Sequence, residues 1–332
     1  MSFKSERYKN SVKYKFSLQD KEENDYIRNI KGKPYRHFFK KTELNLWEDI
    51  RKDAIAYFAA KGITWHTNET ENNPETIPEG NMHSSQISCV NHLFLLRKNQ
   101  AYAAAILKNI DKRIVAAGIV CDGYGNDGYV EFESWGTAEN NNPLNEKEYG
   151  TLPKGKKWKR QRGAFSTSVD ALMVGKKDNG RNILVLVEWK FTESYPYGTI
   201  IRTSNSKEYN KLLLEDENPI TQISDFNDLY YDPFYQLMRQ TLWGWKTIND
   251  YCCDEYIHLH IIPDENLEIQ KITSPNLRSK GNTMSDVWKS FLKEPFKYKV
   301  ISPDKLLSPL KKNHELKGFL GYLQARYMEK YI

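Results

Sequence analysis

The stretch TSVDALMVGKKDNGRNILVLVEWK, residues 167–190, decides the fold of this chain. It contains two runs of β-forming residues, 169–176 and 182–190, in which Val, Ile and Leu predominate. Between them lies Lys-Asp-Asn-Gly, residues 177–180, a composition typical of a turn. We therefore expect the two runs to form a β-hairpin.

This hairpin would bring two carboxylates together. If it is centred on Asn179, residues equally far from Asn179 face each other, and Asp170 then lies opposite Glu188. Lys190 follows on the same face, because side chains alternate along a strand with a period of two. Like charges about 5 Å apart across a strand pair are destabilising, so a compensating cation is expected.

A divalent cation would provide that compensation. Mg²⁺ is typically held by one or two carboxylates and keeps several waters for substrate phosphates; Mn²⁺ is an expected substitute, and no organic cofactor is implied. We expect Asp170 and Glu188 to bind the metal with the main-chain carbonyl of Trp189, whose side chain would point to the opposite face and into the core. Lys190 would hold the attacking water and stabilise charge on the phosphorus oxygens.

Other interpretations of these residues stay open. Asp170 and Lys190 would be ordinary strand-edge residues if Glu188 simply pairs with Lys190 or another base. A retaining glycosidase also needs two carboxyl groups about 5 Å apart. That chemistry explains neither the lysine nor the basic segment that precedes the hairpin.

The basic segment lies within a long polar stretch, 136–165, that reads as a surface loop. Six Lys and Arg residues fall within 154–162, shortly before Asp170. Such a cluster is typical of a protein that binds a phosphate backbone, although a solvated loop is the other interpretation. The residues expected to contact nucleic acid here are Lys157, Lys159, Arg160, Arg162, Thr167 and Ser168.

Two further elements carry candidate site residues. Glu131 and Glu133 alternate on a predicted strand and share one face, so either could add a metal ligand if that strand neighbours the hairpin; a solvated strand face is the alternative. Of the two, we assign Glu133 to the catalytic site.

The helix expected after Pro233 carries a stripe of residues at spacings of three and four. The stripe consists of Gln236, Arg239, Gln240 and Trp243. We assign Gln236 to the catalytic site and Arg239 to the scissile phosphate, whereas Trp243 is expected to be packing.

The elements around the hairpin indicate an α/β fold, a mixed sheet flanked by helices. They are a helix over 43–61 with Thr42 as N-cap and Gly62 as its stop, a long helix from Ser84 to about Ile110, strands at 113–121 and 129–135, the helix after Pro233 and a strand at 256–262. We expect a helical N-terminal extension over 1–82, a core over 83–263 with an insertion at about 191–231, and a helical C-terminal extension over 264–332.

Composition limits the class of protein. The chain has 332 residues, 39% of them hydrophobic, and no apolar run approaching a membrane span. Its first residues are charged and do not resemble a secretory signal. The four cysteines show neither metal nor disulfide-framework spacing. We expect a cytoplasmic protein with no membrane partner.

Several segments together resemble the PD-(D/E)XK nuclease superfamily and, within it, a group of bacterial restriction-endonuclease-like proteins. The matching segments are Ile63-Thr64-Trp65-His66, Ser84-Ser85-Gln86 with Asn91, Glu131-Phe132-Glu133, Arg162-Gly163-Ala164, Thr167-Ser168-Val169-Asp170-Ala171, residues 188–195 and residues 233–240. The resemblance implies a restriction-endonuclease-like core and a metal-dependent DNA endonuclease used in restriction or defence.

In that resemblance, the catalytic residues map onto Asp170, Glu188 and Lys190. One departure concerns the first core helix, where many superfamily members have a glutamate and this chain has Gln86 and Asn91. A second metal ion at that position is therefore in question.

Three alternatives for function remain at this point. The first is a catalytically silent nuclease fold that binds nucleic acid or a partner protein. The others are a repair nuclease and an RNA-processing nuclease. A homodimer would suit double-strand cutting, because two antiparallel strands need two sites related by a two-fold axis.

Overall fold

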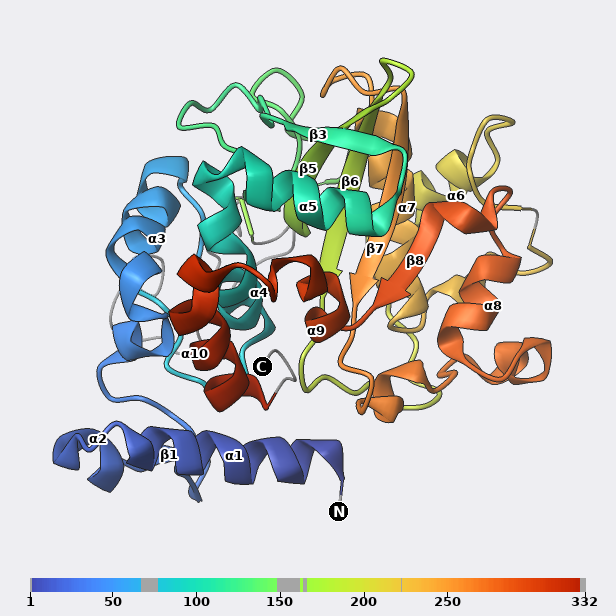
Figure 1. Cartoon of the computed structure of the whole chain (residues 1–332). Helices are drawn as coiled ribbons and strands as arrows, with labels where there is room; N and C mark the ends of the chain where they lie inside the picture. Colours follow the sequence, from blue (N-terminus) through green and yellow to red (C-terminus); the bar gives the residue numbers. More distant parts are fainter. Residues whose placement is uncertain (1, 67–76, 148–161, 164–165, 222, 329–332) are drawn as a thin grey trace.

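A six-stranded mixed β-sheet forms the centre of the molecule (Figure 1). The computed structural model describes residues 2–66, 77–147, 162–163, 166–221 and 223–328. The sheet contains β3 Ile114–Gly118, β4 Glu131–Ser134, β5 Val169–Lys177, β6 Asn182–Trp189, β7 Glu255–Ile261 and β8 Tyr298–Ile301. Its order is β3-β5-β6-β7-β8, and β4 also pairs with β5. The strands β3, β4 and β6 run antiparallel to β5, whereas β6, β7 and β8 are parallel to one another.

The β5–β6 hairpin has the predicted register. The structure pairs Ala171 with Val187 and Lys176 with Asn182, residues that are equally far from Asn179. Gly180, which has a φ of +81°, completes the turn in a conformation that favours glycine. The position of the turn was therefore sufficient to predict the register.

Helices cover both faces of this sheet. The α-helices are α1 Phe3–Ser17, α2 Lys21–Asp25, α3 Glu48–Lys61, α4 Ser85–Leu93, α5 Gln100–Ile110, α6 Ser206–Leu213, α7 Phe234–Thr247, α8 Met284–Ser290, α9 Pro303–Leu306 and α10 Lys317–Tyr327. Together with the mixed sheet they confirm the predicted restriction-endonuclease-like α/β architecture. No helix in the described ranges combines the length and the apolarity needed to cross a membrane.

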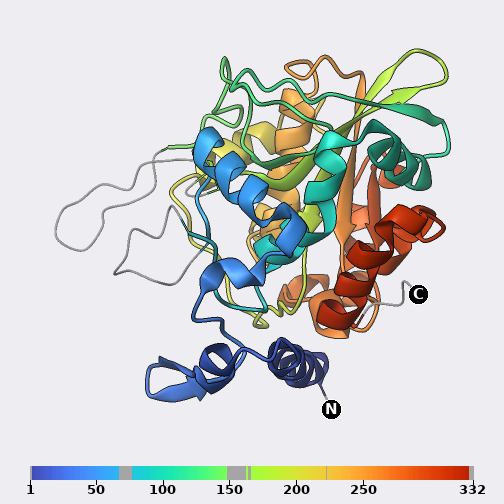
Figure 2. The same cartoon turned by 60° about the vertical axis from the view of Figure 1, so that its left-hand side comes forward.

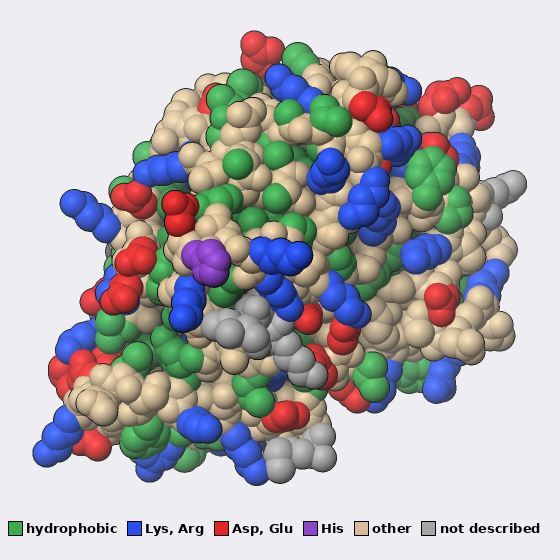
Figure 3. All heavy atoms as spheres, in the orientation of Figure 1, with side chains coloured by type: hydrophobic (Ala, Val, Ile, Leu, Met, Phe, Trp, Pro, Cys, Tyr) green, Lys and Arg blue, Asp and Glu red, His purple; other side chains and the backbone are tan. Residues whose placement is uncertain are grey.

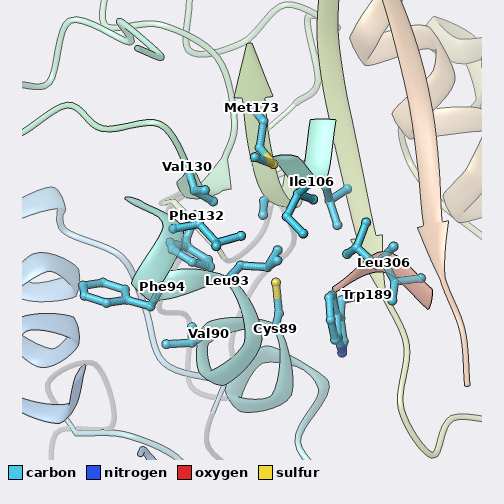
Figure 4. Packing of buried hydrophobic residues seen from close by; sticks show 14 of the residues in the cluster. Cys89, Val90, Leu93, Phe94, Ile106, Val130, Phe132, Met173, Trp189 and Leu306 are labelled. Carbon is cyan, nitrogen blue, oxygen red and sulfur yellow. The ribbon is translucent and has the colours of Figure 1, made fainter. Parts of the chain in front are cut away.

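Alternation along β5 and β6 divides the interior into two hydrophobic cores. Ala171 and Met173 pack with residues of α3, α4, α5 and α10, whereas Leu172 and Val174 pack with residues of α6, α7 and α8. Trp189 points into the first of these cores, near Cys89 of α4 (Figure 4), as expected for a core side chain. The hairpin is therefore buried on both faces, as its nearly continuous apolar sequence requires.

Two predicted helix boundaries were wrong. The helix expected from Ser84 to Ile110 is divided into α4, a 3₁₀ segment over residues 94–98, and α5. The division occurs because the Asn99 side chain accepts a hydrogen bond from the Tyr102 amide at 3.1 Å and caps a new helix. Similarly, Thr42 begins a separate 3₁₀ turn, and α3 begins only at Glu48.

The N-terminal helix α1 packs against the C-terminal helix α10. Figures 1 and 2 show α1 outside the main body, with α10 the nearest part of that body. Asn10 donates to the carbonyl of Arg326 at 3.2 Å, and the buried Lys15 ammonium donates to three main-chain carbonyls between Tyr26 and Phe38. The carbonyls of Arg36 and Phe38 belong to the chain just after a short β-hairpin. This hairpin pairs β1 Arg28–Ile30 with β2 Lys33–Tyr35.

The segments outside the core are less purely helical than expected. Neither the β1–β2 hairpin nor β8 was anticipated, and β8 extends the central sheet from within the segment predicted to be helical. β8 has only four residues, Tyr298–Ile301, and its sequence YKVI is too short to show a clear alternation.

Candidate active site

Asp170, Glu188 and Lys190 meet at one end of the β5–β6 hairpin. The Lys190 ammonium lies 2.5 Å from Glu188 Oε1, and the Trp189 amide donates to Asp170 Oδ2 at 2.6 Å. This hydrogen bond links the two strands just beyond their last regular pair, Ala171 with Val187. The structure thus brings together the two carboxylates and the lysine that the sequence singled out.

Burial makes this group electrostatically unusual. Glu188 and Lys190 are 1% and 7% exposed, and Asp170 is half-buried. Burial, followed by the carboxylates of Glu188 and Glu133, raises the pKa of Asp170 well above its ordinary range. Burial, the largest single influence, lowers the pKa of Lys190, but Glu188 and the other acidic groups around the ammonium together outweigh burial and hold that pKa well above normal. Lys190 is therefore an ammonium, suited to holding a water or an anionic oxygen.

Glu133 lies on β4 beside the other carboxylates. β4 pairs with β5, so the strand of Glu133 neighbours the hairpin, which was the condition for Glu133 to join the site. Its Oε1 accepts a hydrogen bond from Gln86 at 2.8 Å, and its Oε2 accepts one from Ser168 at 3.3 Å. The exposed His66 ring lies 3.8 Å from the same carboxylate. Burial raises the pKa of Glu133 as well. Gln86 is thus in contact with a site carboxylate, at the helix where the superfamily pattern has a glutamate.

Glu131 lies two residues earlier on β4 but belongs to a different environment. Tyr57 donates to its Oε2 at 2.7 Å, and Lys61 and Arg97 each form an ion pair with it at 3.0 Å. Glu133 has a φ of +48°, so the regular alternation of the strand does not continue through it. The expectation that the two glutamates share one face was wrong for this reason.

The glutamine of α7 that contacts Glu188 is Gln240, whereas the sequence analysis assigned Gln236 to the catalytic site. Gln240 donates through Nε2 to Glu188 Oε2 and to the carbonyl of Ser168, the latter at 3.2 Å. Its Oε1 lies 3.0 Å from His258 Nε2, which fixes the orientation of the amide. Gln240 was recognised as part of the helical stripe, but no role was assigned to it.

The assigned members of the α7 stripe lie around this contact. Gln236 accepts a hydrogen bond at 3.3 Å from the hydroxyl of Tyr195, whose ring centroid is 6.0 Å from the Lys190 ammonium. Arg239 donates to Thr167 Oγ1 at 2.9 Å and lies 3.7 Å from a carboxylate oxygen of Glu146. Trp243 is buried in the core, as expected. Catalytic and phosphate-binding roles for Gln236 and Arg239 stay predictions.

The predicted nucleic-acid contacts are distributed unevenly. Lys157, Lys159 and Arg160 lie outside the described residues. Arg162 is 2% exposed and pairs with Asp122 at 2.8 Å, so its guanidinium faces the interior rather than a ligand. On the face shown in Figure 3, Lys and Arg side chains are interspersed with Asp and Glu.

Thr167 and Ser168 lie beside the carboxylates. The Thr167 hydroxyl and amide both donate to Glu146, at 2.5 and 3.0 Å. The Ser168 hydroxyl and carbonyl contact Glu133 and Gln240 as described above. These two residues therefore hold the loop that enters β5, and their expected contacts with nucleic acid stay predictions.

The residues present fit a hard divalent cation. Glu188 Oε1 is buried, lies in an ion pair with the Lys190 ammonium and, among the described residues, has no hydrogen-bond partner. Asp170, Glu188 and Glu133 influence one another's charge, and together they outnumber this ammonium in a buried place. No three His, Cys, Asp or Glu side chains in the described ranges are arranged to bind one metal ion together. Two carboxylates, a main-chain oxygen and water would be the ligand set, as is usual for Mg²⁺. The Trp189 carbonyl as one of these ligands stays a prediction.

Two nearby histidines have structural partners. His258 contacts Gln240 and Thr241, and the Nδ1 atom of His260 lies 2.9 Å from the Tyr298 hydroxyl. Burial lowers the pKa of His258 to about 3. Both are buried histidines, and His258 has partners at both ring nitrogens whereas His260 has one at Nδ1.

Comparison with known proteins identifies one family. A family model described as Restriction Endonuclease associating with ARP matches residues 12–328, which is nearly the whole chain. Neither the search of curated proteins nor the search of solved structures gave a match.

Proposed function

Because the chain belongs to the family of restriction endonucleases associating with ARP, we propose that it is a metal-dependent endonuclease that hydrolyses phosphodiester bonds in DNA. The observation that carries this proposal is the buried group of Asp170, Glu188 and Lys190 at the end of one hairpin. It supports an active site of the PD-(D/E)XK type, because the carboxylate charge exceeds that of the single ammonium.

Each side chain has a distinct task in the proposed reaction. Lys190 holds the attacking water and stabilises the charge that develops on the phosphorus oxygens, as its permanently charged ammonium allows. Asp170 and Glu188 are the expected ligands of Mg²⁺, for which Mn²⁺ is an expected substitute. When bound, the metal supplies Lewis-acid polarisation of the phosphate and lowers the pKa of water. Gln240 holds the Glu188 carboxylate in place from α7.

The biological setting follows from the same premise. We propose a role in restriction or defence, with DNA as the substrate and the ARP partner of the family description as an associated protein. A homodimer would place two such sites on opposite DNA strands. The four cysteines are free thiols, which agrees with action in a reducing cytoplasm.

The test is plasmid cleavage in Mg²⁺ with the full chain, Lys190→Met and a control, Lys176→Met. Lys176 is an exposed residue of the same hairpin, so its substitution removes the same charge away from the site. We expect the wild type and Lys176→Met to cut and Lys190→Met to be inactive. Equal cutting by all three proteins, or no cutting by the wild type in either Mg²⁺ or Mn²⁺, would refute the proposal.

A further inference from the structure

A pocket of about 460 Å³ adjoins the candidate active site, a volume within the usual range for small-molecule sites. It is formed where the N-terminal segment meets the chain that follows Lys190. Its lining residues are Lys4, Tyr8, Ile30, Tyr35, His37, Phe38, Asn81, His83, Thr192, Glu193, Ser194 and Tyr195. We call it the histidine pocket.

Two stacked histidines form its most unusual feature. The rings of His37 and His83 lie 4.4 Å apart at an angle of 27°, and the residues are 7% and 9% exposed. Among the described residues, His37 Nδ1 and His83 Nε2 have no hydrogen-bond partner although both atoms are buried. A buried polar atom left unpaired costs about 1–3 kcal/mol. Both atoms belong to side chains that line one pocket, and this pairing of unsatisfied nitrogens with an adjoining hollow points to a polar ligand.

The histidine pocket is aromatic and uncharged at these two rings. Burial lowers the pKa of His37 to about 4 and that of His83 to about 3, so each ring is neutral and offers one donor and one acceptor nitrogen. Tyr8, Tyr35 and Phe38 lie with ring centroids 5.0, 5.6 and 4.8 Å from His37. This combination fits a flat ligand that stacks on rings and also carries donors and acceptors at its edge.

Tyr195 connects the histidine pocket to the active site. It lines the pocket, and its ring centroid is 6.0 Å from the Lys190 ammonium. It also lines a second pocket that contains Lys271, Arg278 and Tyr197, where the Arg278 guanidinium lies 5.0 Å from the Tyr197 ring centroid. The two pockets therefore lie on either side of Tyr195, one aromatic and one basic.

We propose that the histidine pocket binds one unpaired nucleobase of the DNA whose phosphate lies at Lys190. This inference rests on the proposed nuclease function. Proteins recognise unstacked bases by stacking them on aromatic rings and hydrogen-bonding their edges, and basic side chains hold the adjoining backbone. A base within a duplex is stacked on both faces and paired along one edge, so only a single-stranded or extruded base enters a pocket of this kind. The site accordingly prefers DNA that is locally unpaired next to the scissile phosphate.

The test uses single-stranded oligonucleotides that carry one 2-aminopurine, whose fluorescence is quenched by stacking. Binding to the full chain is measured in EDTA, so that the result does not depend on cutting. Ser194→Trp fills the histidine pocket from an exposed position, and Ser308→Trp, at an exposed serine elsewhere, is the matched control. His83→Phe keeps an aromatic ring and removes the ring nitrogens.

We expect quenching by the wild type and Ser308→Trp, and binding about tenfold or more weaker in Ser194→Trp, as loss of one stacked base predicts. His83→Phe should also bind more weakly. The same 2-aminopurine within a duplex is already quenched by its stacked neighbours, and adding the protein should quench it no further. Equal binding by Ser194→Trp and Ser308→Trp, or an equal additional quenching of duplex and single strand by the protein, would overturn the inference.

Failure of this inference can be separated from failure of the nuclease proposal. If the wild type cuts plasmid but binds the base no better than Ser194→Trp does, base binding by the histidine pocket is refuted and the nuclease proposal stands. Base binding in EDTA by a protein that cuts nothing in Mg²⁺ or Mn²⁺ would refute the nuclease alone.

Discussion

Glu131 and Glu133 lie two residues apart on β4, yet their surroundings differ in charge balance. Glu131 belongs to an ion cluster in which three cations face three carboxylates. The cluster consists of Lys61, Arg97, Arg162, Asp122, Asp127 and Glu131. Glu133 belongs to the carboxylate site with Asp170 and Glu188, where Lys190 is the only ammonium in contact among the described residues.

The difference separates a structural group from a functional one. Buried charges are tolerated when each has partners, and the ion cluster meets that condition with ion-pair distances of 2.8–3.6 Å. The carboxylate site does not meet it, because most of its hydrogen-bond partners are uncharged and Lys190 is the ammonium in contact among the described residues. Burial raises the pKa of Glu131 in the ion cluster, whereas the pKa of Asp170 is raised well above its ordinary range by burial and by two neighbouring carboxylates. Removing a charge should therefore harm folding in the ion cluster, whereas in the carboxylate site it should harm activity.

The largest expected effect is at Asp170. Asp170→Asn removes one of the mutually repelling carboxylates and one expected metal ligand, so we expect DNA cleavage to fall by about 10²–10³-fold or more while the folded state is no less stable. Cleavage rates and urea unfolding check the two halves of this prediction. Asp178→Asn, in the exposed turn of the same hairpin, is the control and should change neither.

The ion cluster should show the opposite behaviour. Arg162→Met leaves Asp122 and Glu131 buried with fewer partners, and we expect it to lower the free energy of unfolding by about 3–5 kcal/mol. Denaturant titration measures this loss. Arg181→Met removes an arginine from an exposed pair with Asp254 and should have little effect. A fully stable Arg162→Met protein would remove the contrast between the two groups.

The two glutamines of α7 test which residues belong to the carboxylate site. Gln240→Leu removes the amide that holds Glu188, so we expect activity to fall about 10–100-fold and the Mg²⁺ concentration for half-maximal cleavage to rise. Gln236→Leu removes only the contact with Tyr195 and should have the smaller effect. A larger loss of activity in Gln236→Leu than in Gln240→Leu would support the catalytic role that the sequence analysis assigned to Gln236.

The smallest expected effect is on the pH dependence of stability. Folding raises the pKa of Asp170 above its ordinary value of 3.8, so the folded state favours the protonated form. The stabilisation is complete below pH 3.8 and is lost as the pH rises through the raised value, by no more than about 1.4 kcal/mol for each pH unit.

Unfolding in EDTA across this range checks the sign. The difference in stability between Asp170→Asn and the wild type should grow with rising pH and then level off. A difference that shrinks as the pH rises would mean that the folded protein favours the charged carboxylate, as it does at Asp122 of the ion cluster, whose pKa is lowered.

Much of the candidate site could be predicted because its signals are local. The register of the β5–β6 hairpin followed from a turn centred on Asn179, and it placed Asp170 and Glu188 at one end. The division of the long helix at Asn99 was missed, because a single side-chain cap outweighed a continuous apolar pattern. The helical stripe on α7 was recognised, but its spacing could not show which glutamine reaches Glu188.

The sequence by itself determined the sheet hairpin, its charged residues and the α/β class, because backbone alternation and turn chemistry act over a few residues. Only the tertiary structure decided that Glu131 is paired with cations and Glu133 with an amide, since their partners come from distant helices. It also decided that His37, His83 and Tyr195 line one pocket. Contacts between segments far apart in the chain depend on how whole elements pack, which no local pattern specifies.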